Sequence, residues 1–315
     1  MRVIHGLDAV TPPLARSVLT IGNFDGVHRA HQQLLAEARG FALQDAAPVA
    51  VLTFEPHPLT VVAPQRAPSR LTTVDEKLRL LAENGTDVCV VARSEPALLN
   101  IEPERFVDEL LWATFHPARI VEGPSFGFGR RRRGDATLLR ERAARHGCAV
   151  HIVEPVSVEV EPGESLLVSS SLIRRLIAEG DVHRAALCLG RPHALIGEVV
   201  RGDGRGRTIG FPTANIEAPE QLLPGDGVYD GRATVDRRSF ACAVSIGSTP
   251  TFDGRQRRVE AHLLDCSGDL YGATLRVEFL RFLRAQQRFD SPASLIEQLR
   301  RDVGAVREGA EGTRP

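Results

Sequence analysis

In the first half of the chain, short apolar runs alternate with segments of helical periodicity. The runs are rich in Val, Ile and Leu, and between them apolar residues recur every three or four positions, as in amphipathic helices. Strands joined by helices cross over with one hand and lie parallel, so this alternation predicts an α/β fold built on a parallel sheet. The predicted strands are VLTIG (18–22), VAVLTF (49–54), DVCVVA (87–92), ARIVEG (118–123) and AVHIV (149–153).

The helices predicted between these strands have recognisable ends. Thr72 and Asp75 can cap one that Gly85 terminates, and Asp135 can cap another that ends near Gly147. We expect further helices over residues 28–42, 103–114 and 168–181.

The sequence changes character after about residue 189, where helical periodicity gives way to short β-prone runs separated by Gly and Pro turns. A chain of 315 residues exceeds the size at which one core stops growing, so we expect two domains, residues 1–187 and 188–315. The second is predicted to be a small antiparallel β-barrel with a C-terminal helix that starts at Ser291 and Pro292. Its predicted strands are 193–201, 227–235, 239–247, 257–265 and 274–283.

Composition and charge argue against several classes of partner. A formal net charge of −1 and a pI near 6.8 give the chain no general attraction for nucleic acid or an anionic membrane. No apolar run approaches the ~20 residues that cross a bilayer, and no signal peptide is recognisable, so we expect a cytoplasmic protein. The five cysteines are widely spaced without a C-x-x-C pair, which argues against zinc and against a disulfide framework. We therefore expect small-molecule partners.

Residues 19–35, LTIGNFDGVHRAHQQLL, combine a strand, a turn and the start of a helix that carries His28 and His31. Two imidazoles at positions i and i+3 share one face of a helix, next to free backbone N–H groups that favour phosphate. The pattern predicts a site for nucleotidyl transfer. Two surface histidines after a turn, or a metal site, are the alternatives. The residues predicted around the phosphates are Gly22, Asn23, Phe24 and Asp25.

The carboxyl ends of parallel strands meet at one edge of a sheet, where ligands bind. Loops begin at Gly22, Glu55 and Gly123, directly after three predicted strands, so we expect these loops to converge. Taken alone, TFEPHP (53–58) is only a rigid loop. The third loop ends in four arginines, 130–133, which could clamp a phosphate or form a solvated basic loop.

The glycine-rich segment RGDGRGRTIGFPTANI (201–216) is the densest motif of the second half. Its glycine spacing is not that of a dinucleotide-binding fingerprint. It predicts a flexible loop that wraps phosphate, followed by Thr213 and Asn215, whose oxygens can coordinate Mg²⁺ bound to ATP. A glycine-rich hairpin without a ligand is the alternative. The predicted phosphate contacts are Gly202, Gly206 and Thr208.

Together these motifs resemble those of the bacterial bifunctional riboflavin kinase/FAD synthetases. The turn with its two histidines resembles the H-x-G-H signature of nucleotidyltransferases, and GFPTAN (210–215) resembles the riboflavin kinase signature. VSSSLIRR (168–175), by itself the start of a serine-capped helix, resembles the family's I-S-S-T-x-I-R motif. The resemblance extends from Gly22 to about Asp302, with the motifs in family order.

This resemblance implies a Rossmann-like nucleotidyltransferase domain followed by a riboflavin kinase barrel. The barrel would phosphorylate riboflavin to FMN with ATP, and the first domain would adenylylate FMN to FAD and release pyrophosphate. It implies that Glu260 is the base for the riboflavin 5′-hydroxyl and that His28, His31 and Arg174 stabilise charge in the second reaction. It further assigns phosphate contacts to Ser170 and Ser171, and flavin contacts to Pro56, His57, Ser125, Phe126, Phe128 and Arg284.

Two alternatives remain open at this point. Because Ala30, Ser125 and Gly127 depart from the family pattern, the chain could be a riboflavin kinase only, with a weakened or regulatory first domain. A non-catalytic flavin-binding protein would instead bind flavin without consuming ATP. The expected partners are riboflavin, FMN and ATP with Mg²⁺, with no nucleic acid and no membrane, and a homo-oligomer is left open.

Overall fold

The computed structural model describes residues 1–12, 14, 16–202, 204–218, 220–251 and 254–312. Its contacts divide the chain into two compact units. The first comprises Met1–Pro68 and Val74–Val168, and the second Ser69–Thr73 and Ser169–Pro315. The contact-based boundary therefore precedes the helix at 170–178, whereas the domain boundary predicted at 187/188 stays a prediction.

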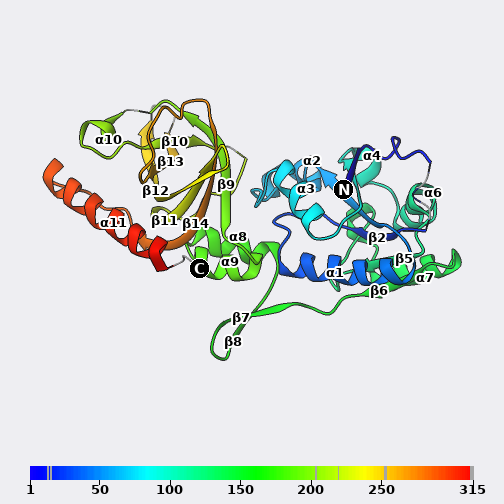
Figure 1. The fold of residues 1–315 in the computed structure, drawn as a ribbon. Helices are drawn as coiled ribbons and strands as arrows, with labels where there is room; N and C mark the ends of the chain where they lie inside the picture. The colour runs from blue at the N-terminus through cyan, green and yellow to red at the C-terminus, as the bar shows by residue number, and fades with distance from the viewer. Residues whose placement is uncertain (13, 15, 203, 219, 252–253, 313–315) are drawn as a thin grey trace. The chain divides into compact units, whose positions relative to one another are not determined.

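The first unit is built on a parallel sheet flanked by helices (Figure 1). The strand order of this sheet is β1-β4-β3-β2-β5-β6. The five predicted strands are confirmed to within one residue at each end. The edge strand β1, RVIH, was missed because it has only two apolar residues between Arg2 and His5 and so lacks the continuous apolar run of the other strands. The strands are β1 (Arg2–His5), β2 (Val18–Ile21), β3 (Val49–Glu55), β4 (Val88–Arg93), β5 (Arg119–Glu122) and β6 (Ala149–Ile152).

Helices connect these strands as the sequence predicts. Asp135 caps α7, since its Oδ1 accepts the Leu138 N–H at 2.9 Å, and Gly85 follows the end of α3 with φ +83°. The helix predicted over 103–114 is interrupted by a π-helical segment, Phe106–Leu111. The helices are α1 (Arg29–Gln44), α2 (Pro58–Val62), α3 (Val74–Glu83), α4 (Pro96–Leu99), α5 (Pro103–Arg105), α6 (Trp112–Phe115) and α7 (Ala136–Arg145), with 3-10 turns at Pro64–Arg66 and Arg130–Arg132.

Both faces of this sheet are buried. Successive residues of a strand point to opposite faces, and accordingly Leu19 and Val18 belong to different hydrophobic clusters. One cluster includes Leu35 of α1 and Leu81 of α3, and the other includes Leu139 of α7. Burial of the strands on both faces explains their continuous apolar runs.

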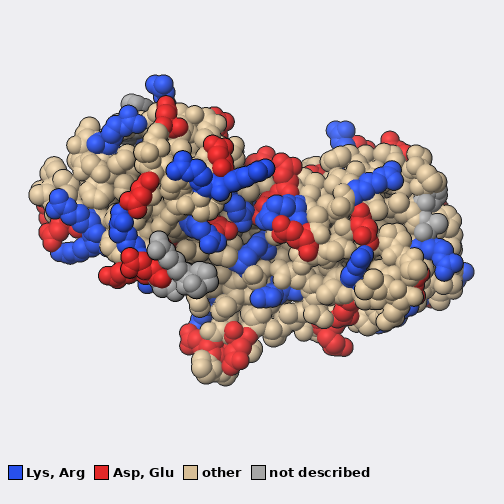
Figure 2. All heavy atoms as spheres, in the orientation of Figure 1, with Lys and Arg blue, Asp and Glu red and all other residues tan. Residues whose placement is uncertain are grey.

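An antiparallel hairpin of β7 (Ser157–Glu161) and β8 (Glu164–Leu167) follows the sheet and was not predicted. Its glutamates are exposed. Acidic atoms gather where Figure 1 places this hairpin, whereas acidic and basic side chains are interspersed elsewhere on the face shown in Figure 2.

Besides Ser69–Thr73, the second unit contains α8 (Ser170–Ala178) and α9 (Val182–Leu189), which lead into a closed antiparallel barrel. The predicted barrel is confirmed, and its strand order is β10-β13-β12-β11-β14-β9. It has a sixth strand, β10, inside the glycine-rich motif. The strands are β9 (His193–Val200), β10 (Ala214–Glu217), β11 (Gly227–Val235), β12 (Arg238–Thr251), β13 (Gly254–Leu263) and β14 (Thr274–Arg284), and the terminal helix is α11 (Pro292–Gly312).

One local feature of this unit was not predicted. The segment predicted as a flexible phosphate loop contains a helical turn, α10 (Arg205–Thr208). The Phe211 N–H donates to the Gly206 carbonyl at 2.8 Å and fixes the chain that follows this turn. Backbone hydrogen bonds among residues 204–211 hold this turn, and glycine content alone did not indicate it.

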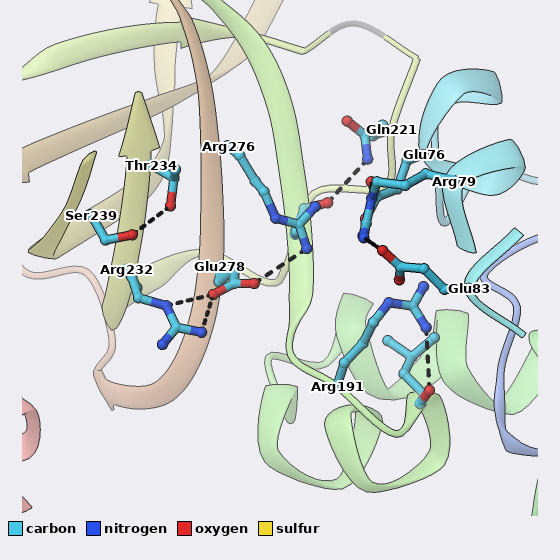
Figure 3. Close-up of polar contacts among 12 residues, drawn as sticks. Glu76, Arg79, Glu83, Arg191, Gln221, Arg232, Thr234, Ser239, Arg276 and Glu278 are labelled. Carbon is cyan, nitrogen blue, oxygen red and sulfur yellow. Dashed lines mark hydrogen bonds and ion pairs between the residues drawn. The ribbon is translucent and has the colours of Figure 1, made fainter. Parts of the chain in front are cut away.

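Ion pairs tie the outer surface of the barrel together. Glu278 on β14 accepts hydrogen bonds from Arg232 of the adjacent strand β11, at 2.7 Å, and from Arg276, at 3.2 Å (Figure 3). Figure 3 also shows Arg79 of α3 between Glu76 and Glu83, which lie on the same helix. The guanidinium groups of these arginines form ion pairs with carboxylates of the same chain.

Helix α11 is attached to the barrel by a buried ion pair. The Arg284 guanidinium contacts both carboxylate oxygens of Asp302, at 2.7 to 3.2 Å, and Gln298 donates to the same carboxylate at 2.9 Å. The side chains of Arg284 and Asp302 are 19% and 5% exposed. A bidentate pair of this kind fixes both position and orientation of the helix.

We expect Asp302→Ala to lower the free energy of unfolding of the second unit by about 3–5 kcal/mol, because it leaves a largely buried guanidinium unpaired. Far-UV circular dichroism in urea would measure the loss. Fluorescence of Trp112, the one tryptophan and a residue of the first unit, should show an unchanged transition.

The matched control is Arg307→Ala, which breaks an exposed pair with Asp265. Pairs of that kind contribute about 0–1 kcal/mol. Equal losses for the two variants would contradict the structural importance assigned to Asp302.

Candidate active sites

The turn between β2 and α1 is held by buried apolar side chains in an unusual backbone conformation. Phe24, Gly26 and Val27 all have positive φ, at 49°, 83° and 37°. This region is unfavourable for Phe and Val, yet their side chains are almost fully buried. Burial therefore stabilises a strained turn that delivers the chain to the N-terminus of α1.

The two histidines of the motif lie against each other at that N-terminus. His28 is the N-cap residue of α1, and its ring stacks on that of His31 with 3.7 Å between centroids and 16° between planes. The Phe24 ring lies 5.0 Å from His31. The structure thus brings His28 and His31 together beside the N–H groups of the first turn of α1, where an anion is favoured.

Asn23 connects this turn to the loop after β3. Its carboxamide lies 3.1 Å from Nε2 of His57, and the Leu59 N–H donates to Nδ1 of His57 at 3.2 Å. The atom of the Asn23 carboxamide that faces Nε2 is the amide nitrogen Nδ2. The predicted residues Asn23 and His57, with Pro56 beside it, therefore belong to one cluster.

Lys77 is a member of this cluster that sequence reasoning missed. Its side chain, on α3, is 7% exposed, and Nζ lies 3.2 Å from Oε2 of Glu55. The same Nζ lies 3.5 Å from the Asn23 carbonyl oxygen and from the Thr53 hydroxyl. A buried ammonium group requires such partners, and Lys77 thereby fastens the turn after β2 to the end of β3.

Glu122 is a second residue that sequence reasoning missed. It is the last residue of β5, is 2% exposed, and its Oε1 accepts the Ile21 N–H at 2.6 Å. Burial raises the pKa of the Glu122 carboxyl well above its ordinary value, and backbone hydrogen bonds from Ile21 and Gly123 partly oppose the shift. Perturbed carboxyl groups at a sheet edge are candidates for functional residues.

The loop after β5 combines a buried and a more accessible aromatic ring. Phe128 is 5% exposed and packs against Phe106, with 5.5 Å between centroids. Phe126 stacks on Phe128 at 5.4 Å and is only partly buried. Of the two predicted flavin contacts, Phe128 is thus a core residue, and Phe126 has the more accessible ring. Ser125 is exposed.

The arginines that follow this loop have separate contacts. Arg132 donates to the Ser125 carbonyl at 3.1 Å, and its guanidinium occupies the space that a side chain on Gly127 would need. Arg130 and Arg133 pair with Glu102 at 3.1 and 3.4 Å. These arginines therefore do not act as one cluster, since Arg132 contacts the loop after β5 and two others pair with a surface carboxylate.

The serine motif lies in the second unit. Ser169 is the N-cap of α8 and accepts the Leu172 N–H at 3.2 Å, which confirms the predicted serine cap. Ser170 and Ser171 form the first turn of the helix. Arg174 donates through Nε to the Ser69 carbonyl at 2.9 Å, within the same unit.

In the barrel, the predicted metal ligand and the predicted base are direct neighbours. Asn215 on β10 lies opposite Glu260 on β13, and Ser245 on β12 lies opposite Glu260 on its other side. Residues directly opposite in an antiparallel pair have Cβ atoms about 4.5–5.5 Å apart. The strand register thus juxtaposes an amide, a carboxylate and a hydroxyl.

Two glycines of the motif approach these residues closely. A Cβ added to Gly202 would lie 2.1 Å from the Asn215 carboxamide, and one added to Gly206 would lie 2.3 Å from the Phe211 carbonyl oxygen and 3.4 Å from the Thr213 hydroxyl. At position 206 the obstacle is backbone, so glycine is required, whereas a side chain at position 202 would displace the Asn215 carboxamide. The structure gathers Gly202, Gly206, Thr213 and Asn215, and Thr208 ends the helical turn between them.

Glu260 lines a cleft of roughly 470 Å³ on the barrel. Arg258 lies two residues away on the same strand and lines the same cleft, which makes it a further basic residue that the motifs did not indicate. Gln286 helps to build the wall, since its amide donates to Ser245 Oγ and to the Ile246 carbonyl, both at 2.9 Å.

Arg284, predicted to contact flavin, instead has its guanidinium engaged with Asp302. Any influence of Arg284 on the cleft would therefore pass through α11 and the neighbouring segment 286–288.

Other features bear on the remaining expectations. None of the helices that the structure describes is long and apolar enough to cross a membrane. All five cysteines are free thiols, and four of them are buried. Within the described ranges, no three His, Cys, Asp or Glu side chains are grouped to hold a metal ion.

Comparison with known proteins gives matches over both units. A family model described as FAD synthetase matches residues 11–167, and one described as riboflavin kinase matches residues 189–309. A bifunctional riboflavin kinase/FMN adenylyltransferase of Escherichia coli strain K12 is 36% identical over 317 residues, covering 100% of both chains. The corresponding protein of Bacillus subtilis strain 168 is 31% identical and covers 96% of this chain and 95% of its own.

A solved structure is also similar over the whole chain. It is described as a macrolide-efflux protein from Streptococcus pneumoniae, and it matches with a TM-score of 0.87 and 30% identity, covering 98% of this chain and 99% of its own. A relative from Pseudomonas fluorescens, again a bifunctional riboflavin kinase/FMN adenylyltransferase, is 34% identical over 98% of this chain and 97% of its own length.

Proposed function

This chain belongs to the family of bifunctional riboflavin kinases/FMN adenylyltransferases, and from that premise we propose which residues carry each reaction. It has both an FAD synthetase domain and a riboflavin kinase domain, and its relatives match over their full length. These matches favour two activities over a kinase with a merely regulatory first domain. The reactions are ATP-dependent phosphorylation of riboflavin to FMN and adenylylation of FMN to FAD.

For the kinase reaction, we assign the role of general base to Glu260. The observation that supports this most directly is the register that sets Glu260 opposite Asn215 at a cleft of the barrel. Glu260 would accept the proton of the riboflavin 5′-hydroxyl as its oxygen bonds to the γ-phosphorus of ATP and the bond to the β-phosphate oxygen breaks, which releases ADP. The tight approach of Gly202 and Gly206 would leave backbone N–H groups near the phosphates.

The donor set beside Glu260 fits a hard divalent cation. The Thr213 hydroxyl and the Asn215 carboxamide oxygen are the neutral oxygen donors that Mg²⁺ accepts along with ATP phosphates and water. We propose that these two residues hold Mg²⁺, which would neutralise charge on the phosphates. The absence of a side chain at Gly202 leaves room for the Asn215 carboxamide, which a larger residue would displace.

For the adenylyltransferase reaction, the FMN phosphate oxygen attacks the α-phosphorus of ATP and pyrophosphate leaves. No protein nucleophile is needed, so the protein acts through positioning and charge stabilisation. The stacked His28 and His31, with the N–H groups of α1, would stabilise charge on the ATP phosphates. Gly22, Asn23, Phe24 and Asp25 would line the nucleotide, and Pro56, His57, Ser125 and Phe126 the flavin. Phe128, a core residue, would support the Phe126 ring that stacks on it.

Three residues of α8 are assigned by their motif. Ser170, Ser171 and Arg174 match positions that bind the β- and γ-phosphates in the family that the sequence resembles, and we retain that assignment as a proposal. The hydroxyls and N–H groups of a capped helix N-terminus and a guanidinium are suited to a departing pyrophosphate. The substrates are small, and we propose a cytoplasmic location without nucleic-acid or membrane partners, with a homo-oligomer left open.

Product analysis with the full chain tests these assignments together. With Mg²⁺, riboflavin and ATP should give FMN and ADP in equal amounts, and FMN and ATP should give FAD and pyrophosphate in equal amounts. Addition of excess chelator should stop FMN formation, and Mg²⁺ should restore it. FMN formation at an undiminished rate in chelator would contradict the roles proposed for Thr213 and Asn215.

A further inference from the structure

At the end of the two strands that precede the predicted nucleotide and flavin loops, a side chain replaces the ladder of backbone hydrogen bonds. The register of β2 and β5 pairs Val18 with Arg119 and Leu19 with Ile120. Ile21 and Glu122 lie beyond that register, although they are paired on their outer sides with Leu52 and Ile152.

The Ile21 N–H faces this gap. Donors of a strand alternate between its two neighbours, and the next N–H along the chain, that of Gly22, donates to the Leu52 carbonyl of β3 at 3.0 Å. The Ile21 N–H is thus directed toward β5, where Oε1 of Glu122 accepts it at 2.6 Å. Without that carboxyl, a buried backbone donor would lose its acceptor.

The gap between β2 and β5 lies at the switch point of the sheet, where the connections after the two strands run in opposite directions. The connection after β2 leads to β3 on one side of it, and the connection after β5 leads to β6 on the other side. In open parallel sheets, ligands bind in the crevice at such a point. The two connections begin with the turn that carries Asn23 and His28 and with the loop that carries Ser125 and Phe126.

We propose that Glu122 is a positioning residue of the adenylyltransferase site, whose carboxyl group bridges the ends of β2 and β5 and thereby sets the separation of the nucleotide turn from the flavin loop. The inference rests on the function proposed above, because it matters for catalysis only if ATP and FMN bind at those two loops. The reacting oxygen and phosphorus must approach to about 3–3.5 Å, so a bridge of fixed length controls the reaction without touching either substrate.

The environment of the side chain supports a neutral, hydrogen-bonded bridge. Glu122 is 2% exposed, and burial raises the pKa of its carboxyl well above the ordinary value, which favours the neutral acid. Backbone N–H groups of both Ile21 and Gly123 bond to this one side chain. Glutamine has the same length and the same carbonyl acceptor, whereas aspartate is an acid that is shorter by one methylene group.

Length and acidity can therefore be separated by two variants. We expect Glu122→Gln to retain kcat for FAD synthesis near the wild-type value. We expect Glu122→Asp to lower kcat by about 100-fold, as misplacement of reacting groups by about 1 Å does, with KM for ATP and for FMN little changed because each loop still binds its own substrate. A role as an ionised acid would give the reverse order, and a role in packing alone would leave kcat unchanged in both.

Three control measurements distinguish a change in catalysis from misfolding or a general loss of stability. FMN formation from riboflavin in the same preparations reports on the second unit and should not change, and Trp112 fluorescence reports that the first unit remains folded. Ile120→Val, on the same strand, should alter stability without altering kcat. Activity of the Asp variant near that of wild type, or equal losses in the Asp and Gln variants, would overturn the inference while leaving the proposed function intact. A folded wild-type chain that makes no FAD would overturn both.

Discussion

Replacing Glu260 by glutamine is expected to remove most FMN formation by this chain and to leave FAD synthesis from added FMN unchanged. Glutamine keeps the shape of the side chain but cannot accept the proton of the riboflavin hydroxyl. General base catalysis contributes about 10²- to 10⁴-fold, so kcat for FMN formation should fall by that factor. KM for riboflavin and ATP should change much less, because the base acts mainly in the transition state.

The reaction products should be separated chromatographically and detected by flavin fluorescence, once with riboflavin and once with FMN as substrate. FAD formation by the same preparation shows that the first unit is folded, and an unchanged urea transition in far-UV circular dichroism shows that the barrel is folded. The matched control is Glu198→Gln on β9, an exposed glutamate of the barrel that does not line the cleft. An E260Q variant that forms FMN as fast as wild type would exclude Glu260 as the base.

The opposite pattern is expected when the histidine pair is disrupted. His28→Asn should lower kcat for FAD formation by about 10²- to 10³-fold, the loss typical when one preorganised donor to developing charge is removed. FMN formation should be retained. The effect arises because His28 caps α1 and its ring stacks on His31 at 3.7 Å, so a single substitution removes one ring and the support of the other.

His146→Asn is the matched control for this variant. His146 follows the C-terminus of α7 and bonds to Asp108 at 3.0 Å. The C-terminus of a helix that precedes a parallel strand lies at the amino edge of the sheet, opposite the carboxyl edge where the histidine pair lies. If both substitutions lower FAD synthesis equally, the effect of His28→Asn reflects stability of the first unit, and the charge-stabilising role of His28 is wrong.

Much of the fold follows from local patterns in the sequence. The parallel strands were predictable because both faces of each are buried, which produces continuous apolar runs such as VAVLTF. The ends of α7 and α8 were predictable because Asp135 and Ser169 cap them through bonds to residues three positions later. Contacts of such short range are recorded in adjacent sequence, so propensities and spacing reveal them.

The elements that were missed depend on partners far along the chain. Strand β1 is short and is defined by pairing with β4, more than eighty residues away. Strand β10 lies within a motif whose glycines suggest a loop, and pairing with β9 and β13 on its two sides makes it a strand. The helical turn α10 and the π-helical break after α5 likewise have no pattern in the sequence that distinguishes them from a loop and a continuous helix.

By itself the sequence determined the two-part architecture, the histidine pair on one helix face and the glycine-rich kinase motif, because residue spacing and local backbone chemistry are sufficient for these. Tertiary structure alone decided that Lys77 joins Asn23 to Glu55, that Arg284 serves Asp302, and that Glu122 bridges to Ile21 across a separation of 101 residues. Each of these groups is polar and buried, so its role is set by the partner that satisfies it, and the order of strands in the sheet or barrel determines which partner that is.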